Sequence, residues 1–499
     1  MVSIPRLVIA APASGHGKTT IATGLCAAFT GRGFKVAPFK VGPDYIDPGY
    51  HSLAAGRTGR NLDPYLVGAE RVPGLFLHGS QTADIAVVEG VMGLYDGAVG
   101  EGELASTAQV AKLLGAPVLF VVDAAAQGRS IGALVHGFRS FDPQVRIGGV
   151  ILNRGGSDRH GRILSEALDD LGVPMLGSLR RADAVATPSR HLGLVPVAER
   201  RAEALAAVAA LGELIEASVD LPAIHRLARS APSIVAEDWD ARAEVGTPVA
   251  GRPRIAVAGG AAFTFSYAEN IELLAASGAQ IVPFDPLRDE ALPDGVAGLV
   301  IGGGFPEVYA AELSANERLR ESVAAFARAG GSVAAECAGL LYLGKSLDGV
   351  PMCGVLDADA TLTSSLTLGY RHAVAAVDSV LAVAGSRVAG HEFHRTATAP
   401  SAGSPPAWHW RRDEGAVTEG FAGDRIHASY LHLHWAGSPR IPRRFVESCA
   451  ALGTLGPLGT LGTLGPLGTL GTLGPLGTLG TLGPLGTLGP LRTSGTVRE

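Results

Sequence analysis

Residues 6–20 decide the fold of the first half of the chain and read Arg6-Leu-Val-Ile-Ala-Ala-Pro-Ala-Ser-Gly-His-Gly-Lys-Thr-Thr20. The apolar run predicts a buried strand, and Lys18 begins a helical pattern. A glycine loop between a strand and a helix surrounds an anion with backbone N–H groups, and Lys18 adds a full positive charge. We therefore expect the following residues to bind phosphate groups: Ser14, Gly15, His16, Gly17, Lys18, Thr19 and Thr20.

One position departs from the usual phosphate-loop pattern. A glycine normally lies five positions before Gly17, and this chain has Pro12 there. Gly15 restores some backbone freedom. An ordinary glycine-rich turn is the alternative interpretation, and the Gly-Lys-Thr sequence after a strand favours phosphate binding over it.

Composition limits the class of protein. A chain of 499 residues with 47% hydrophobic and 18% charged residues is typical of a soluble globular protein with two to four domains. The net charge of −6 argues against a nucleic-acid partner, and no apolar run of about 18 residues predicts a membrane span. The four cysteines lack metal-binding spacing, which favours the reducing cytoplasm. They are Cys26, Cys337, Cys353 and Cys449.

Acidic residues follow two predicted strands of the first half. The strand 35–40 leads into a Pro- and Gly-rich loop with Asp44 and Asp47, and the strand that begins near Ala83 ends at Glu89. Asp96 follows in the next loop. Ligands bind at the carboxyl ends of parallel strands, where an acid can hold the Mg²⁺ of a nucleotide. A solvated turn is the alternative for Glu89 and Asp96.

The predicted elements divide the chain into domains. Strands at 116–123, 146–153 and 173–179 alternate with helices, so we expect a doubly wound parallel sheet over residues 1–195. A helical segment and a linker follow at 196–252. A second α/β domain is expected at 253–446, because a new series of strands and helices starts near Arg254.

The second half contains a candidate nucleophile. Cys337 lies where an apolar strand turns into a helix, an elbow that exposes a nucleophile and at which the helix N-terminus lowers the pKa of a thiol. Three glycines from Gly302 onward follow another strand and let N–H groups approach an oxyanion. A lone cysteine is more often inert, so this interpretation depends on both features and on the late histidines.

Two histidines are candidate bases for this thiol. His432 and His434 lie on the same face of an extended segment, and their spacing does not choose between them. The segment Gly390-His-Glu-Phe-His394 is a second polar cluster, for which we favour a ligand or interface contact over a metal site. The other three cysteines lack such a context and are interpreted as structural.

These motifs together resemble the glutamine-dependent a,c-diamide synthases of corrin biosynthesis. The resembling segments run in order from about residue 6 to residue 436: PASGHGKTT, FKVGPDYIDPGYH, VVEGVMGLYDG, RHLGLV, AFTFSYAEN, GGGFPE, AECAGLLYL, LGYR, GHEFHRT and HASYLHLHW. The resemblance implies a phosphate-loop domain like dethiobiotin synthetase, followed by a class I-type glutamine amidotransferase domain.

The resemblance also implies an activity. ATP would convert the a and c carboxylates of cobyrinate or hydrogenobyrinate to acyl phosphates, and ammonia from glutamine would amidate them, which makes the chain a carbon–nitrogen ligase of cobalamin biosynthesis. Cys337 would attack glutamine, and the family's Tyr-x-His pattern falls on His432. Backbone groups of Gly303, Gly304 and Ala338 would hold the oxyanion.

The resemblance assigns roles to the acids as well. Mg²⁺ would be bound by Thr19, Asp47 and Glu89, whereas Asp44 and Asp96 would serve the carboxylate that is activated. The partners are thus a corrinoid acid, ATP and glutamine. The sequence leaves open whether the corrinoid contains cobalt, which carboxylate reacts first and the oligomeric state, for which a homodimer is one option.

Two other functions fit parts of the sequence. Cobyric acid synthase or another glutamine-dependent tetrapyrrole ligase is the alternative within the same chemistry, and the Pro-Asp-Tyr-Ile-Asp-Pro loop favours the a,c-diamide enzyme. A partition-type phosphate-loop ATPase is the alternative of another class. Such a switch needs neither Cys337 nor His432.

The end of the chain is a repeat. From Gly453 to Leu491 glycine recurs at every third position, separated by Thr-Leu or Pro-Leu. A glycine every third residue meets the rule for a collagen helix, but leucine occupies a fixed place and prolines are sparse. We interpret residues 452–499 as a disordered, low-complexity tail.

We predict that deleting the residues after Leu452 leaves the rate of glutamine-dependent amidation unchanged, because every motif lies before them. Steady-state turnover of the truncated and full-length proteins checks this. A large loss of turnover would show that the repeat is functional.

Overall fold

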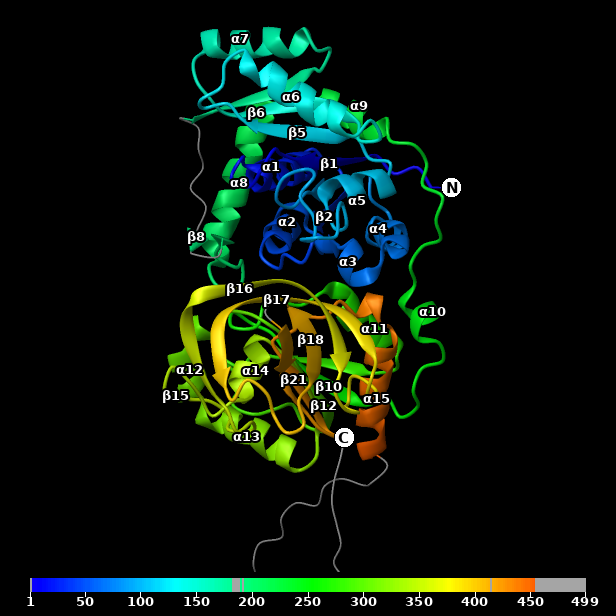
Figure 1. The fold of residues 1–499 in the computed structure, drawn as a ribbon, viewed down its shortest axis with the longest axis vertical. Coiled ribbons are helices and arrows are strands. Elements are labelled where there is room, and N and C mark those ends of the chain that lie inside the picture. Colours follow the sequence, from blue (N-terminus) through cyan, green and yellow to red (C-terminus); the bar gives the residue numbers. More distant parts are fainter. Residues whose placement is uncertain (1, 182–188, 191–192, 413–414, 454–499) are drawn as a thin grey trace, which may run out of the picture. The chain divides into compact units, whose positions relative to one another are not determined.

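Short buried apolar runs build a seven-stranded sheet in the first half (Figure 1). The computed structural model describes residues 2–181, 189–190, 193–412 and 415–453. Neighbouring strands are all parallel, so their carboxyl ends share one edge of the sheet. In spatial order the strands are β3 (Arg60–Leu62), β2 (Val36–Val41), β4 (Ile85–Glu89), β1 (Arg6–Ala10), β5 (Val118–Asp123), β6 (Ile147–Gly155) and β7 (Met175–Arg180).

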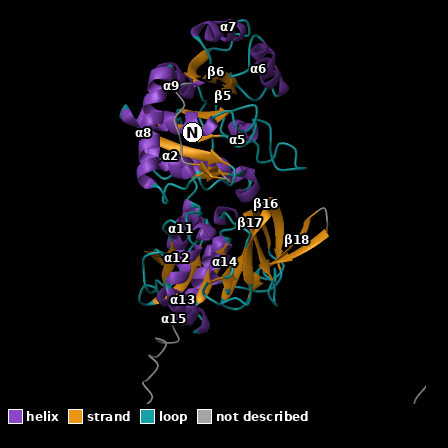
Figure 2. Ribbon diagram, turned by 90° about the vertical axis from the view of Figure 1, so that its left-hand side faces the viewer, coloured by secondary structure: helices purple, strands orange, loops and turns teal. Residues whose placement is uncertain are grey.

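Helices cover both faces of this sheet, which confirms the predicted doubly wound fold. Alternate residues of β1 belong to different cores: Leu7 and Ile9 to one, Val8 and Ala10 to the other. Figure 2 shows α8 and α9 on one side of the strands and α5 and α6 on the other. The helices are α1 (Lys18–Gly31), α2 (Asp47–Ala55), α3 (Pro64–Val67), α4 (Val72–Gly79), α5 (Thr107–Leu113), α6 (Ser130–Phe141), α7 (Asp158–Asp169), α8 (Arg201–Ser218) and α9 (Leu221–Arg229).

The second half has its own mainly parallel sheet. Its spatial order is β11 (Gln280–Phe284), β10 (Arg254–Ala258), β12 (Val296–Ile301), β13 (Ser332–Glu336), β21 (Ile426–Ser429) and β20 (Phe421–Ala422). Only β20 is antiparallel to its neighbour. The flanking helices are α11 (Ala268–Ala276), α12 (Ala310–Ala315), α13 (Glu317–Arg328), α14 (Ala338–Leu343) and α15 (Arg440–Gly453). The second α/β series is therefore confirmed.

A mainly antiparallel sheet in the second half, in which only β14 and β16 pair in parallel, was not among the expectations. Its longest strands, β16 (Asp359–Ala375) and β17 (Arg387–Ala399), pair with each other. Much of β16 is exposed or half-buried, so its sequence lacks the continuous apolar run that identifies the parallel strands. The other strands are β14 (Ser346–Leu347), β15 (Val350–Pro351), β18 (Trp408–Arg412) and β19 (Gly415–Glu419).

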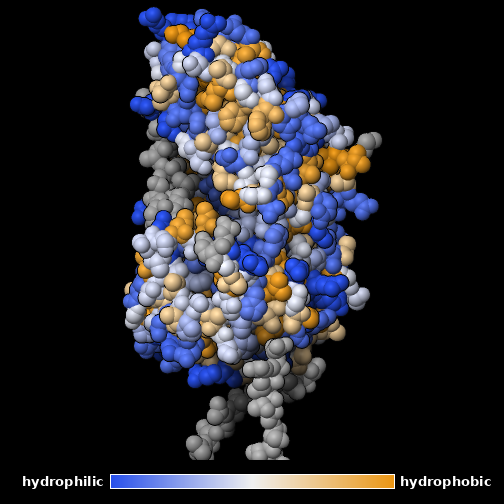
Figure 3. All heavy atoms as spheres, in the orientation of Figure 1, coloured by the Kyte–Doolittle hydropathy of each residue, from blue (hydrophilic) through white to orange (hydrophobic). Residues whose placement is uncertain are grey.

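Three further expectations concern the linker, the tail and the membrane. The stretch expected as a linker contains the short helix α10 (Ala241–Val245). The repeat at 454–499 lies outside the described residues. Among the helices that the structure describes, none combines the length and apolar character of a membrane span. In Figure 3, hydrophilic residues cover much of the visible face, with hydrophobic residues scattered among them.

Buried polar contacts join the two halves of the chain, which lie within one compact unit. Arg60 on β3 forms ion pairs with Glu269 at 2.6 Å and Glu272 at 2.5 Å, both on α11. The Tyr370 hydroxyl on β16 donates to Asp63 Oδ2 at 2.9 Å. Burial of Glu269, whose side chain is 1% exposed, makes its ion pair with Arg60 important for stability.

We predict that Arg60→Ala destabilises the protein by about 3–5 kcal/mol, because Glu269 loses its cation while it remains buried. The midpoint of thermal unfolding measures this loss. Arg32→Ala is the matched control, since the ion pair between Arg32 and Glu216 is solvent-exposed and contributes little. Equal midpoints for the two variants would contradict the importance of the buried pair.

Candidate functional site

The predicted phosphate loop connects β1 to α1. Gly15 (φ 83°) and Gly17 (φ 96°) both have left-handed backbone, which glycine adopts without strain. A Cβ atom at Gly17 would lie 2.1 Å from Asn153 Nδ2, so a larger residue would have to displace the Asn153 side chain. The same Asn153 amide donates to His16 O at 2.9 Å and thereby fixes the loop.

Lys18 crosses the loop at the start of α1. Its Nζ donates to Met92 O at 2.5 Å and to Ala13 O at 3.2 Å. Burial, followed by repulsion from Lys40, lowers the pKa of Lys18 to about 8. A phosphate oxygen is a stronger partner for an ammonium group than a neutral carbonyl oxygen, so a bound phosphate can replace both carbonyls.

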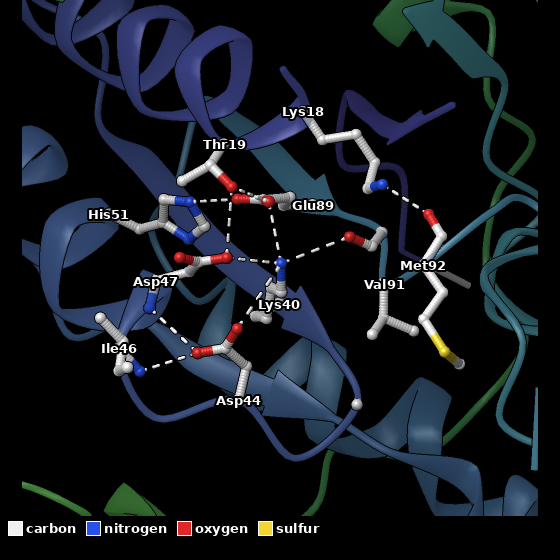
Figure 4. Close-up of polar contacts among 12 residues, drawn as sticks. Lys18, Thr19, Lys40, Asp44, Ile46, Asp47, His51, Glu89, Val91 and Met92 are labelled. Atoms are coloured by element: carbon white, nitrogen blue, oxygen red, sulfur yellow. Dashed lines mark hydrogen bonds and ion pairs between the residues drawn. The ribbon is translucent and has the colours of Figure 1, made fainter. Parts of the chain in front are cut away.

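Beside the loop, ionised side chains gather around Lys40 (Figure 4). Lys40 Nζ donates to Asp47 Oδ2 at 2.7 Å and to Glu89 Oε1 at 2.8 Å. Thr19 Oγ1 donates to the same Glu89 oxygen at 2.7 Å and lies 3.3 Å from Asp47 Oδ2. His51 Nε2 lies 2.7 Å from Glu89 Oε2. The structure therefore brings the three expected Mg²⁺ ligands together.

The sheet positions this cluster. Lys40 and Glu89 are directly paired across β2 and β4, near the carboxyl ends of both strands. Asp47 starts α2, and Thr19 belongs to the first turn of α1. The expectation that both Asp44 and Asp47 lie in a loop is therefore wrong for Asp47, because Pro48 at the first turn favours a helix start there.

Electrostatic coupling within the cluster decides which groups are charged. Burial and the neighbouring Asp44 raise the pKa of Asp47 to about 7. Burial alone would also raise the pKa of Glu89, but Lys40 and His51 bring it well below its usual range. The two carboxylates hold the pKa of Lys40 above its ordinary value despite its burial. The lysine thus stays charged between them.

Lys40 and His51 were missed in the sequence analysis. A lysine within an otherwise apolar strand was the available signal for Lys40, because a lysine is rarely buried without an acidic partner. His51 lies one helical turn after Asp47 on α2, a spacing that places both side chains on one face.

The other two expected acids lie at the margin of the cluster. Asp44 Oδ1 accepts from the N–H groups of Ile46 (2.7 Å) and Asp47 (3.1 Å), and its Oδ2 is 4.0 Å from Lys40. Asp96 Oδ2 accepts from Gly93 N at 2.9 Å within its own turn. Both carboxylates accept from backbone N–H groups of their own turns, which is compatible with roles outside the ion site.

The donor atoms fit Mg²⁺ bound to a nucleotide. Thr19 Oγ1, Asp47 Oδ2 and Glu89 Oε1 are hard oxygen ligands close to one another. In the part of the chain that the structure describes, no three or more His, Cys, Asp or Glu residues form a metal cage of their own. Mg²⁺ needs only one or two carboxylates when phosphates and water complete its shell.

Cys337 has the predicted elbow geometry in the second half. It follows β13 and precedes α14, with a strained backbone at φ 50° and ψ −101°. Its N–H donates to Ser429 O at 2.8 Å, and its Sγ lies 3.9 Å from Phe393 O. The strand–helix turn therefore holds the thiol against β17, the strand that contains Phe393.

The protonation of this thiol differs from the expectation. The N–H of Ala338 at the start of α14 lowers the pKa of Cys337 as predicted, but burial and the negative charge of Glu307 outweigh it. The pKa of Cys337 is therefore well above the usual thiol range. The predicted lowering of this pKa is wrong for this structure. A base must remove the thiol proton when the substrate binds.

The glycines expected at the oxyanion position have different surroundings. Gly303 N donates to Phe265 O at 3.2 Å, so this donor is occupied. A Cβ atom at Gly304 would lie 2.0 Å from Ala262 O, and only glycine fits there. Gly304 and Ala338 therefore fit an oxyanion role better than Gly303.

The two candidate histidines have different acidic neighbours. His432 Nδ1 lies 3.9 Å from Oε2 of Glu336, the residue before Cys337. His434 Nε2 lies 3.6 Å from Glu269 Oε2, and the other oxygen of that carboxylate, Oε1, pairs with Arg60. Burial lowers the pKa of His432 to about 3, which leaves its imidazole neutral and able to accept a proton. This geometry favours His432 as the base.

Tyr45 places an aromatic ring from the first half beside His432. Its ring stacks on Phe265 with centroids 5.0 Å apart and lies 5.1 Å from the His432 ring. Tyr45 follows Asp44 directly in the sequence and was missed as a site residue. The same loop therefore contacts the ion cluster and the surroundings of the thiol.

The remaining candidates are the segment 390–394 and three cysteines. Glu392 accepts from Arg371 Nε and from Arg412 at 2.5 Å each, and its neighbour His394 stacks on Tyr430 at 3.8 Å. Glu392 is thus held by two arginines, whereas His391 Nδ1 and His394 Nε2 are buried without a hydrogen-bond partner among the described residues. Outside this segment, the remaining cysteines are buried and free of disulfides: Cys26, Cys353 and Cys449.

Comparisons with known proteins assign both halves to families. Residues 7–195 match the CobQ/CobB/MinD/ParA nucleotide binding domain. Residues 254–440 match the CobB/CobQ-like glutamine amidotransferase domain. The phosphate loop and the ion cluster lie in the first matched region, and Cys337 with both histidines lies in the second.

Several curated proteins are similar over nearly their whole length. The hydrogenobyrinate a,c-diamide synthase of Streptomyces coelicolor is 63% identical over 90% of this chain and 98% of its own length. The protein of that name from Thermobifida fusca is 53% identical over 91% of this chain and 98% of its own. The cobyrinate a,c-diamide synthase of Gloeobacter violaceus is 44% identical over 89% of this chain and 97% of its own length.

We predict that Lys40→Met destabilises the protein by about 3–5 kcal/mol, because Asp47 and Glu89 are left buried without a cation. MgCl₂ should restore part of the thermal midpoint of this variant by neutralising the same carboxylates. Lys35→Met, at an exposed position, is the control and should show neither effect. A wild-type midpoint and no response to MgCl₂ would contradict the assigned cluster.

Proposed function

The chain belongs to the family of hydrogenobyrinate and cobyrinate a,c-diamide synthases, and on that premise we propose that it amidates the a and c carboxylates of such a corrinoid acid with ATP and glutamine. One observation carries the proposal: a single chain combines the phosphate loop and ion cluster with a buried Cys337 elbow. A nucleotide switch would use only the first of these. The proposed reaction class is a carbon–nitrogen ligase with glutamine as amide donor.

The glutaminase half-reaction uses Cys337. Its Sγ attacks the side-chain amide carbon of glutamine, and the thiol proton passes to neutral His432. N–H groups of Ala338 and Gly304 stabilise the oxyanion that forms. His432 then gives the proton to the amide nitrogen, which leaves as ammonia. Water hydrolyses the remaining thioester to glutamate and restores the thiol.

The ligase half-reaction uses the first half of the chain. A substrate carboxylate oxygen attacks the γ-phosphorus of ATP, which gives an acyl phosphate and releases ADP. Ammonia attacks the acyl carbon, and phosphate leaves. Lys18 and the loop residues would hold the phosphate groups, and we assign Asp44 and Asp96 to the carboxylate that is activated. Two rounds yield the a,c-diamide.

The residues also support the proposed cofactor. Thr19, Asp47 and Glu89 would hold Mg²⁺, which neutralises phosphate charge when it is bound. Lys40 donates to both carboxylates and lowers the pKa of each, which holds them in place. We place the reaction in the cytoplasm, because ATP is available there and free cysteines stay reduced.

Hydrogenobyrinate is the first substrate to test. The relatives with that name are 51–63% identical to this chain, whereas those named for cobyrinate are 41–44% identical. Mass spectrometry of the products with each acid, ATP and glutamine distinguishes one amidation from two. A product from cobyric acid synthase chemistry would carry amides at other side chains.

We predict reciprocal losses in two variants. Cys337→Ala should abolish glutamine-dependent amidation and retain amidation with free ammonia, because only the ammonia source is lost. Lys18→Ala should abolish amidation with either nitrogen source and leave glutamine hydrolysis measurable. Loss of both activities in folded Cys337→Ala protein, or unchanged amidation by Lys18→Ala, would overturn the assignment of two sites.

A further inference from the structure

His432 is a buried base whose orientation needs an explanation. Its side chain is fully buried, and neither ring nitrogen has a hydrogen-bond partner in the described residues. Its backbone is fixed, because His432 and His391 exchange two hydrogen bonds of 2.9 and 3.0 Å. A neutral imidazole has two tautomers, and only the one with a free Nε2 lone pair can accept a proton at that atom.

Glu336 lies beside this imidazole. It is the last residue of β13 and precedes Cys337, so the elbow that fixes the thiol also fixes the carboxyl group. Glu336 Oε2 is 3.9 Å from His432 Nδ1, and its Oε1 has no hydrogen-bond partner among the described residues. The separation is about 1 Å longer than a hydrogen bond, a gap that catalytic groups often close when a substrate binds.

Other acids near the segment are already engaged. Glu392 is held by Arg371 and Arg412, and Glu269 pairs with Arg60 and faces His434. Within the described part of the chain, Glu336 is the acidic residue whose carboxylate lies within 4 Å of a His432 ring nitrogen. The rings that contact His432 from elsewhere, Tyr45 and Phe265, present aromatic surface to it.

We propose that Glu336 is a positioning residue for His432: its carboxylate accepts the Nδ1–H and leaves Nε2 to take the thiol proton of Cys337. When the imidazole becomes positively charged, the adjacent carboxylate stabilises that charge. No atom of Glu336 reacts, and the proton returns from Nε2 to the leaving ammonia. The inference rests on the proposed glutaminase reaction at Cys337.

The protonation of Glu336 gives the proposal a distinctive pH dependence. Burial raises the pKa of Glu336 to about 8. The protonated acid cannot accept the Nδ1–H, so the hydrolysis rate should rise as the pH increases through about 8 and the group ionises. The described titratable groups that face Glu336 are Tyr45, Tyr267, Cys337 and His432.

The test compares Glu336→Gln with wild type across the pH range. We expect kcat for glutamine hydrolysis to fall by about 100-fold or more, while KM changes little and amidation with free ammonia stays at the wild-type rate. The rise in rate near pH 8 should disappear. Glu419→Gln is the matched control, because burial also raises the pKa of Glu419 to about 8, and it should keep the rise.

Glu336→Asp tests whether a loss of activity in Glu336→Gln reflects a folding defect, because aspartate retains the carboxylate charge. If Glu336→Gln loses ammonia-dependent amidation as well, the aspartate variant decides: a retained rise with pH supports the proposal, and a flat profile refutes it. A wild-type kcat and pH profile in folded Glu336→Gln protein also refutes it. Failure of the proposed function is recognised separately, by glutamine hydrolysis that survives Cys337→Ala.

Discussion

The ion cluster around Lys40 is the interaction on which the first half depends. Two carboxylates at the edge of a buried sheet repel each other, and the lysine between them offsets that repulsion with contacts of 2.7 and 2.8 Å. Pairing of Lys40 with Glu89 across β2 and β4 fixes the geometry on rigid strands.

The two halves share residues at their contact. Tyr45 continues the loop that holds Asp44 and Asp47, and its ring reaches His432 in the second half. Arg60 on β3 in the first half likewise reaches the second half, where it forms an ion pair with Glu269 beside His434. The two histidines therefore have separate surroundings: His432 lies 3.9 Å from Glu336, the residue before Cys337, and His434 lies beside the ion pair of Glu269 with Arg60.

Burial explains the resting state of the candidate thiol. It raises the pKa of Cys337 and lowers that of His432, so both groups are neutral in this structure. A neutral pair does not react with solvent oxidants or water as readily as a thiolate does. Substrate entry must change this environment before the proton moves.

The sequence by itself determined the fold class, the phosphate loop, the Cys337 elbow and the position of Glu89, because strand and helix periodicity and strand ends are local properties. It missed Lys40 and Tyr45 and left His432 and His434 equivalent by spacing. Only the tertiary structure shows the neighbours of these residues, because those neighbours depend on which charge is buried beside which group. The same burial reversed the expected pKa shift of Cys337, since desolvation is set by surrounding segments rather than by neighbours in sequence.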